Sequence, residues 1–122
     1  MNSVKDRARS VLVVEDEWLI AEMISGELRD AGYAVVGPAP TTDRALALIA
    51  QGGVDAAVLD VNLNGAFCYA LADALDARKI PYLFLTGYIR RDLPSAFRDR
   101  PMLPKPLSPD ALHREVAALL AA

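Results

Sequence analysis

The chain has 122 residues, of which 53% are hydrophobic and 24% charged, with a formal net charge of −3 at pH 7. This length and balance are typical of one compact globular domain and exclude a disordered or fibrous protein. The slightly negative charge argues against nucleic acid as a direct partner, because contacts to phosphates need a basic face.

Apolar runs in the chain are short. The longest, such as Ala56–Leu59 and Ile80–Leu85, fall far below the roughly 20 residues of a membrane span, so we expect no membrane contact. Residues 1–9 are polar and lack the apolar stretch of a secretory signal. We therefore expect a flexible tail over 1–9, one domain over 10–122, and a cytoplasmic protein. A single cysteine, Cys68, excludes an internal disulfide.

Strand and helix signals alternate in the first half of the chain. Ser10–Glu15 is a β-branched apolar run that ends in acids, which predicts a buried strand. Apolar residues then recur at steps of three and four up to Gly32, which is typical of an amphipathic helix and its C-terminus. We expect a second strand over Tyr33–Val36, a turn over Gly37–Pro40, and a second helix capped by Thr42.

The alternation continues into the second half. Asp55–Asp60 predicts a third strand that leads into a loop over Val61–Gly65. A third helix is expected from Phe67 onward, with its apolar residues mostly on one face. Pro81–Leu85 predicts a fourth strand, since proline is tolerated at a first position, and Thr86 and Gly87 mark its exit.

The last third of the chain predicts a short helix, a brief strand and a long helix. Tyr88–Arg98 is interrupted by Pro94, so any helix there is short. A brief strand is expected at Pro101–Leu103, and Ser108 with Pro109 signals the start of the final helix. Five strands alternating with five helices predict an α/β fold with a doubly wound, five-stranded parallel sheet that is covered by helices on each side.

Ligand sites in such sheets lie at the carboxyl ends of the strands. Those ends carry Glu15-Asp16-Glu17, Asp60, Thr86 and Lys105. Acids gathered at one edge favour a bound divalent cation, and Mg²⁺ suits carboxylate ligands. A carboxylate beside that cation can attack a phosphorus atom, while an ammonium and a hydroxyl hold the other phosphoryl oxygens. The pattern therefore indicates Mg²⁺-dependent phosphoryl acceptance on Asp60.

These residues resemble the receiver domains of bacterial two-component signalling. The resemblance covers essentially the whole chain after the tail and implies a flavodoxin-like sheet of strand order 2-1-3-4-5 with five helices. It rests on Val13-Val14-Glu15-Asp16-Glu17, Leu59-Asp60-Val61-Asn62-Leu63-Asn64-Gly65, Thr86-Gly87 and Leu103-Pro104-Lys105-Pro106. It implies a stand-alone response regulator, not an enzyme acting on other substrates, that takes its phosphoryl group from a sensor histidine kinase or a histidine phosphotransfer protein.

The resemblance also implies roles for single residues. Asp60 would be the phosphoacceptor, and Glu15 and Asp16 the acidic pair that positions Mg²⁺. The backbone carbonyl of Asn62 would be a further metal ligand. Lys105 would pair with the phosphoryl group, and its peptide bond to the following proline is often cis in the family.

One position departs from the common family pattern. Many members carry Tyr or Phe three residues before the lysine, where this chain has Met102. Instead, Phe84-Leu85-Thr86-Gly87-Tyr88 resembles a subclass whose aromatic residue follows the threonine and whose members are often single-domain regulators. We therefore expect phosphorylation to draw Thr86 inward and to reposition Tyr88 as a switch.

Several alternatives stay open from the sequence alone. Asp16 could instead cap the first helix. Trp18 could contact the donor kinase or pack against a neighbouring loop. A phosphatase of the haloacid dehalogenase type is disfavoured because it needs a second acid at the position of Asn62. A flavodoxin-like electron carrier is disfavoured because the acids Glu15-Asp16-Glu17 would repel the phosphate that it binds after its first strand. A receiver that acts without phosphorylation is a further possibility. The output, by adaptor binding, relay or phosphate sink, and any homodimer are not determined.

Overall fold

The structure of the protein is a computed structural model, and it describes residues 8–63, 66–67, 69–87, 95, 99–105 and 107–121. Its strands are β1 (Ser10–Val14), β2 (Ala34–Ala39), β3 (Ala56–Asp60), β4 (Asn62–Leu63), β5 (Ala66–Phe67), β6 (Tyr82–Thr86) and β7 (Met102–Pro104). Its helices are α2 (Trp18–Asp30), α3 (Thr42–Gln51), α4 (Tyr69–Ala77) and α5 (Pro109–Ala121).

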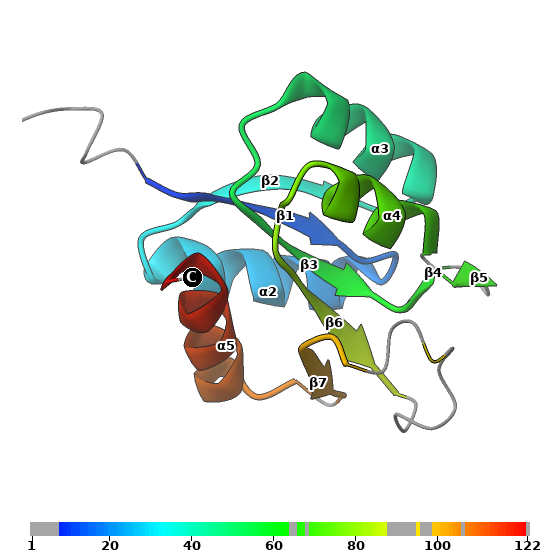
Figure 1. The fold of residues 1–122 in the computed structure, drawn as a ribbon. Coiled ribbons are helices and arrows are strands. Elements are labelled where there is room, and N and C mark those ends of the chain that lie inside the picture. Colours follow the sequence, from blue (N-terminus) through cyan, green and yellow to red (C-terminus); the bar gives the residue numbers. More distant parts are fainter. Residues whose placement is uncertain are drawn as a thin grey trace, which may run out of the picture.

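Five of the strands form one parallel sheet in the order β2-β1-β3-β6-β7 (Figure 1). This is the order 2-1-3-4-5 that the sequence predicts, so the flavodoxin-like architecture is confirmed. The central strands are apolar on both faces, and β3 and β6 are buried along their whole length. Such strands need helices on both sides of the sheet.

Two apolar cores result, one on each face. Side chains of α3 and α4 pack with Leu59 of β3 on one face, and side chains of α2 and α5 pack with the neighbouring Val58 on the other. Successive strand residues point to opposite faces, so each core fixes the strand from its own side. Asp60, the last residue of β3, is thereby held at the carboxyl edge of the sheet.

The second strand is longer than predicted. β2 continues through the expected turn Gly37–Pro40 as far as Ala39, so the turn prediction is wrong. Because β2 is an edge strand paired with β1 alone, Pro38 can lack its N–H there. Gly37 has φ 93°, and a Cβ there would lie 2.7 Å from the Ala39 nitrogen, so a glycine is required where the pairing register shifts.

The connection after β3 also differs from prediction. Instead of an irregular loop over Val61–Gly65, β4 pairs antiparallel with β5, with Asn62 opposite Phe67. Phe67 therefore lies in a strand, not in the helix expected there, and α4 begins at Tyr69. Buried Leu63 packs in the same core as residues of α4, which anchors β4 directly after the strand that ends at Asp60.

The starts of α3 and α5 agree with the sequence to within a residue. The cap of α3 is Thr41, whose hydroxyl accepts a hydrogen bond from the Arg44 N–H at 3.2 Å, so the predicted cap Thr42 is wrong by one position. At α5, the Ser108 hydroxyl accepts from the Ala111 N–H at 3.4 Å, and Pro109 is the first helical residue as predicted.

Some predicted features fall outside the described residues. They include most of the expected helix over Tyr88–Arg98, the switch candidate Tyr88, Cys68, and Pro106 with its peptide bond. Four α-helices are therefore described, where the sequence predicts five. None of the described helices combines the length and apolar character needed to cross a membrane.

Candidate functional site

Four strand ends bring the predicted site residues to one edge of the sheet. Asp60 and Thr86 are the last residues of β3 and β6, Glu15 directly follows β1, and Lys105 directly follows β7. The backbone ties the neighbouring ends together, since the Lys105 N–H donates to the Thr86 carbonyl at 2.9 Å. Thr86 is buried, with 3% of its surface exposed. The parallel topology is the physical reason that residues so distant in sequence meet here.

Lys105 bridges the two buried acids of the site. Its Nζ lies 3.0 Å from Asp60 Oδ2 and 3.3 Å from Glu15 Oε1. The side chains of Glu15 and Asp60 are 0% and 7% exposed, and that of Lys105 is 27% exposed. One ammonium thus faces two carboxylates in a largely dry environment, which leaves an excess of negative charge when both acids are ionised.

The pKa of Glu15 reflects this environment. Burial is the largest effect and raises the pKa of Glu15 from 4.5 to about 7. The Glu17 N–H, which donates to Glu15 Oε2 at 3.2 Å, lowers it, Asp60 raises it further, and Lys105 lowers it. Oε1 makes no well-formed hydrogen bond among the described residues, and its contact is the ion pair with Lys105 at 3.3 Å. Glu15 is therefore a buried carboxyl that shares its ammonium partner with Asp60.

The pKa of Lys105 is raised, although burial alone would lower it. Burial favours the neutral amine, but the hydrogen bond and charge of Asp60, together with Glu15, outweigh it and raise the pKa of Lys105. The side chain therefore stays an ammonium at neutral pH and is available to contact an anionic group at Asp60.

Three carboxylates have the geometry of a cation site. One oxygen each of Glu15, Asp16 and Asp60 lies within 4.8 Å of the other two. Oxygen ligands of this kind suit Mg²⁺, which commonly takes one or two carboxylates and keeps several waters. The buried Oε1 of Glu15, which has no hydrogen bond among the described residues, and the excess negative charge are the features that a divalent cation would satisfy, so these residues fit the metal that the sequence predicts.

Asn62 has a role that the sequence analysis did not identify. Its N–H donates to Asp60 Oδ1 at 3.0 Å, while Lys105 contacts Oδ2. Both oxygens of Asp60 are therefore held, one by the backbone and one by an ammonium. An Asp whose side chain accepts from the N–H two residues later forms an Asx-turn, a signal that was available in the sequence. The predicted use of the Asn62 carbonyl as a metal ligand stays a prediction.

Two residues beside the acids can now be placed. The residue at the N-cap position of α2 is Glu17, not Asp16, and the Glu17 side chain makes no capping hydrogen bond. Trp18, the first residue of α2, is 73% exposed. It lines a cavity of about 270 Å³ together with Asp16, Pro38 and Pro40. A large aromatic side chain thus stands open to solvent directly beside the candidate cation site.

The chain is similar to one protein family and to solved structures. The profile of the response regulator receiver domain matches residues 11–117. The solution structure of SdrG from Sphingomonas melonis Fr1 is 45% identical with a TM-score of 0.81, covering 93% of this chain and 97% of that one. The BeF3-activated conformation of SdrG from Pseudomonas melonis Fr1 is 46% identical with a TM-score of 0.79, covering 91% and 95%.

A curated relative is similar over part of its length. The transcriptional regulatory protein PdtaR of Mycobacterium tuberculosis is 33% identical over 92 residues, which make up 75% of this chain and 45% of that protein. The chain therefore spans less than half the length of this relative.

Proposed function

Because the chain belongs to the response regulator receiver domain family, we propose that it accepts a phosphoryl group on Asp60 in a Mg²⁺-dependent reaction. The observation that carries this proposal is the Asp60 carboxylate held between the Asn62 N–H and the Lys105 ammonium, at an edge with two further carboxylates. That the protein acts as a stand-alone regulator in the cytoplasm stays a prediction from the sequence.

The proposed reaction is an in-line displacement at phosphorus. A carboxylate oxygen of Asp60 forms the new O–P bond, the P–N bond of a phosphohistidine donor breaks, and its electron pair goes to the departing imidazole nitrogen. Lys105, now 3.0 Å from Oδ2, would move its contact to a phosphoryl oxygen. The Thr86 hydroxyl would donate to another. The chain would thus promote only its own phosphorylation and dephosphorylation.

The metal would be held by Glu15, Asp16 and Asp60, with the carbonyl of Asn62 as a further ligand. When bound, Mg²⁺ offsets the repulsion between the carboxylate and the incoming phosphoryl oxygens. Phosphorylation would draw Thr86 inward and reposition Tyr88, and the resulting change of surface would be passed to a partner protein.

Exposed apolar residues support a docking surface for the phosphoryl donor. Trp18, Leu19 and Met23 on α2 are 73%, 66% and 38% exposed, and they begin directly beside the acidic site. Large exposed aromatic and apolar side chains are typical of contact surfaces. We propose that the sensor histidine kinase or phosphotransfer protein contacts this start of α2, which brings its histidine to Asp60.

The proposal is tested by intact mass. The purified protein is mixed with acetyl phosphate, with and without Mg²⁺, beside the Asp60→Asn variant. A Mg²⁺-dependent gain of one phosphoryl group that the variant lacks supports the proposal. Since this donor can react slowly, an absent gain is followed by a phosphorylated histidine kinase as donor. No transfer from either source would favour the alternative, a receiver that binds partners without phosphorylation.

A phosphoryl mimic provides a second measurement. SdrG was solved in a BeF3-activated conformation, so the same group with Mg²⁺ is expected to shift the amide resonances of Asp60, Thr86 and Lys105 here. The shifts should vanish when Mg²⁺ is replaced by EDTA. Unchanged resonances would contradict the metal-dependent acceptor site.

A further inference from the structure

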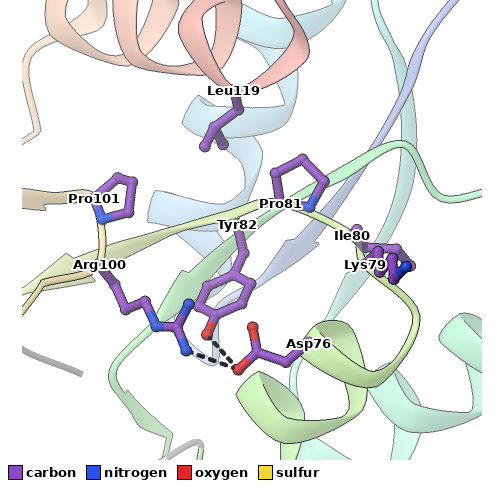
Figure 2. Close-up of a pocket in the computed structure, with 8 residues that line it drawn as sticks. All are labelled: Asp76, Lys79, Ile80, Pro81, Tyr82, Arg100, Pro101 and Leu119. Atoms are coloured by element: carbon purple, nitrogen blue, oxygen red, sulfur yellow. Dashed lines mark hydrogen bonds and ion pairs between the residues drawn. The ribbon is translucent and has the colours of Figure 1, made fainter. Parts of the chain in front are cut away.

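A second cavity lies at the opposite edge of the sheet from Asp60 (Figure 2). Its volume is about 410 Å³, within the range of small-molecule sites. Pro81 and Pro101, which line it, directly precede β6 and β7, so the cavity sits at the amino ends of these strands. It is therefore separate from the acidic site at the carboxyl ends.

One wall of the cavity is a fixed polar network. Asp76 Oδ2 accepts a hydrogen bond from the Tyr82 hydroxyl at 3.2 Å and pairs with the Arg100 guanidinium at 3.0 Å (Figure 2). The guanidinium carbon of Arg100 also lies 5.5 Å from the centre of the Tyr82 ring. Two donors, the Tyr82 hydroxyl and the Arg100 guanidinium, thus already contact the Asp76 carboxylate. The Arg100 guanidinium and the Tyr82 ring form a cation–π pair beside it.

The remaining walls are apolar. Ile80 and Pro81 come from the connection before β6, Pro101 from the residue before β7, and Leu119 from the last turns of α5 (Figure 2). Apolar walls with a few placed polar groups are the usual character of a site for a small organic molecule.

Lys79 is a lining residue of the cavity with an unfavourable backbone conformation. It lines the cavity and, among the described residues, forms no ion pair or side-chain hydrogen bond. Its φ is 58°, in the left-handed region. The Lys79 N–H donates to the Asp76 carbonyl at 3.1 Å and the Ile80 N–H to the Leu75 carbonyl at 2.9 Å, the two bonds of a Schellman ending of α4.

The same ending occurs at α2, and the comparison is informative. There the left-handed residue is Gly32, with φ 94°, which is the residue type that this position favours. At α4 the chain places a lysine in the equivalent position, where its side chain reaches the rim of a cavity. Local backbone preference does not explain the lysine, whereas a role for its charge at the cavity does.

We propose that this cavity binds a small organic anion with a flat apolar body, of the aromatic carboxylate class. The apolar walls and the Arg100–Tyr82 pair would receive the ring, and Lys79 would pair with the carboxylate. With Asp76 already paired to Arg100, the lining residues present one uncompensated positive charge, which selects for an anion. This inference does not depend on phosphorylation of Asp60.

The test is an amide NMR titration of the full chain with indole-3-carboxylate and, in parallel, with the neutral indole-3-carboxamide. Saturable shifts are expected at Lys79, Tyr82 and Leu119 with a dissociation constant on the order of 1 mM. The carboxamide should bind about fivefold more weakly, as expected when one partly exposed charge pair is lost. Lys79→Gln should weaken the carboxylate by the same factor.

Arg78→Gln is the matched control, because Arg78 is a neighbouring cation that does not line the cavity. This variant should bind the carboxylate as tightly as the unchanged protein. Any of three results would overturn the proposal: no saturable shifts at these residues, equal affinity for the carboxylate and the carboxamide, or an equal loss in Arg78→Gln and Lys79→Gln. The substituted side chains are on the surface, so well-dispersed spectra are expected for both variants.

Discussion

Replacing Glu15 with Gln is expected to stabilise the metal-free protein at alkaline pH. Burial raises the pKa of this carboxyl from 4.5 to about 7. Each pH unit between the two values corresponds to about 1.4 kcal/mol, so ionising the buried group lowers the free energy of unfolding by at most about 3 kcal/mol. Glutamine has the same shape and no ionised form, and it therefore removes this cost.

The sign follows from proton binding. A raised pKa means that the folded state holds the Glu15 proton more tightly than the unfolded state. The contribution of Glu15 to stability is therefore complete below pH 4.5 and is lost as pH rises through about 7. Lys105 stays an ammonium between pH 5 and pH 8, and the substitution removes the titration of Glu15 itself, so the gain in Glu15→Gln should grow from about 1 kcal/mol at pH 5 to about 3 kcal/mol at pH 8.

Urea unfolding in EDTA at pH 5 and pH 8 measures this difference. Glu22→Gln, on the exposed side of the same helix, serves as the control and should change stability little at either pH. Added Mg²⁺ should stabilise the unchanged protein more than Glu15→Gln, because the variant has lost a metal ligand. A variant less stable than the unchanged protein at pH 8, or a gain that does not depend on pH, would refute the reasoning.

Three further substitutions test other parts of the account. Lys105→Met leaves two buried carboxylates without their ammonium, so it should lower the free energy of unfolding of the metal-free protein at pH 8 by about 2 kcal/mol. Urea titrations measure this loss, and added Mg²⁺ should reduce it. Trp18→Ala should slow phosphotransfer from a histidine kinase about tenfold or more but leave the rate with acetyl phosphate unchanged, and equal loss with both donors would contradict a docking role. Lys79→Gly removes the steric cost of a left-handed non-glycine residue but gives the unfolded chain more entropy. A net gain of about 0.5 kcal/mol should raise the melting temperature by roughly 2 °C, and a lower melting temperature would contradict this prediction.

Much of the fold could be predicted because its signals are local. The apolar runs of β1, β3 and β6 and the helical spacing of α2 and α5 each identify an element, and their alternation predicts a parallel sheet, whose strand order follows from the resemblance to receiver domains. β2 was predicted too short, because Gly37 and Pro38 are turn residues unless the strand is at an edge. Whether a strand lies at the edge depends on the order of the whole sheet, so a short stretch of sequence cannot show it.

The site could be predicted in part for the same reason. Parallel strands place their carboxyl ends together, so the meeting of Glu15, Asp60 and Lys105 followed from the topology. The extent of Glu15 burial did not, since desolvation depends on residues packed around it from other elements. The second cavity was also missed, because Tyr82 reads as an ordinary core residue until Asp76 and Arg100 are seen beside its hydroxyl and ring.

The central claim is that Asp60 carries the phosphoryl group, and chemical trapping tests it most directly. The protein is incubated with a phosphoryl donor and Mg²⁺, reduced with borohydride, which converts an aspartyl phosphate to homoserine, and mapped by peptide mass spectrometry. The account predicts homoserine at position 60 and at no other aspartate. Homoserine at Asp16 or Asp55 with position 60 unmodified would contradict it.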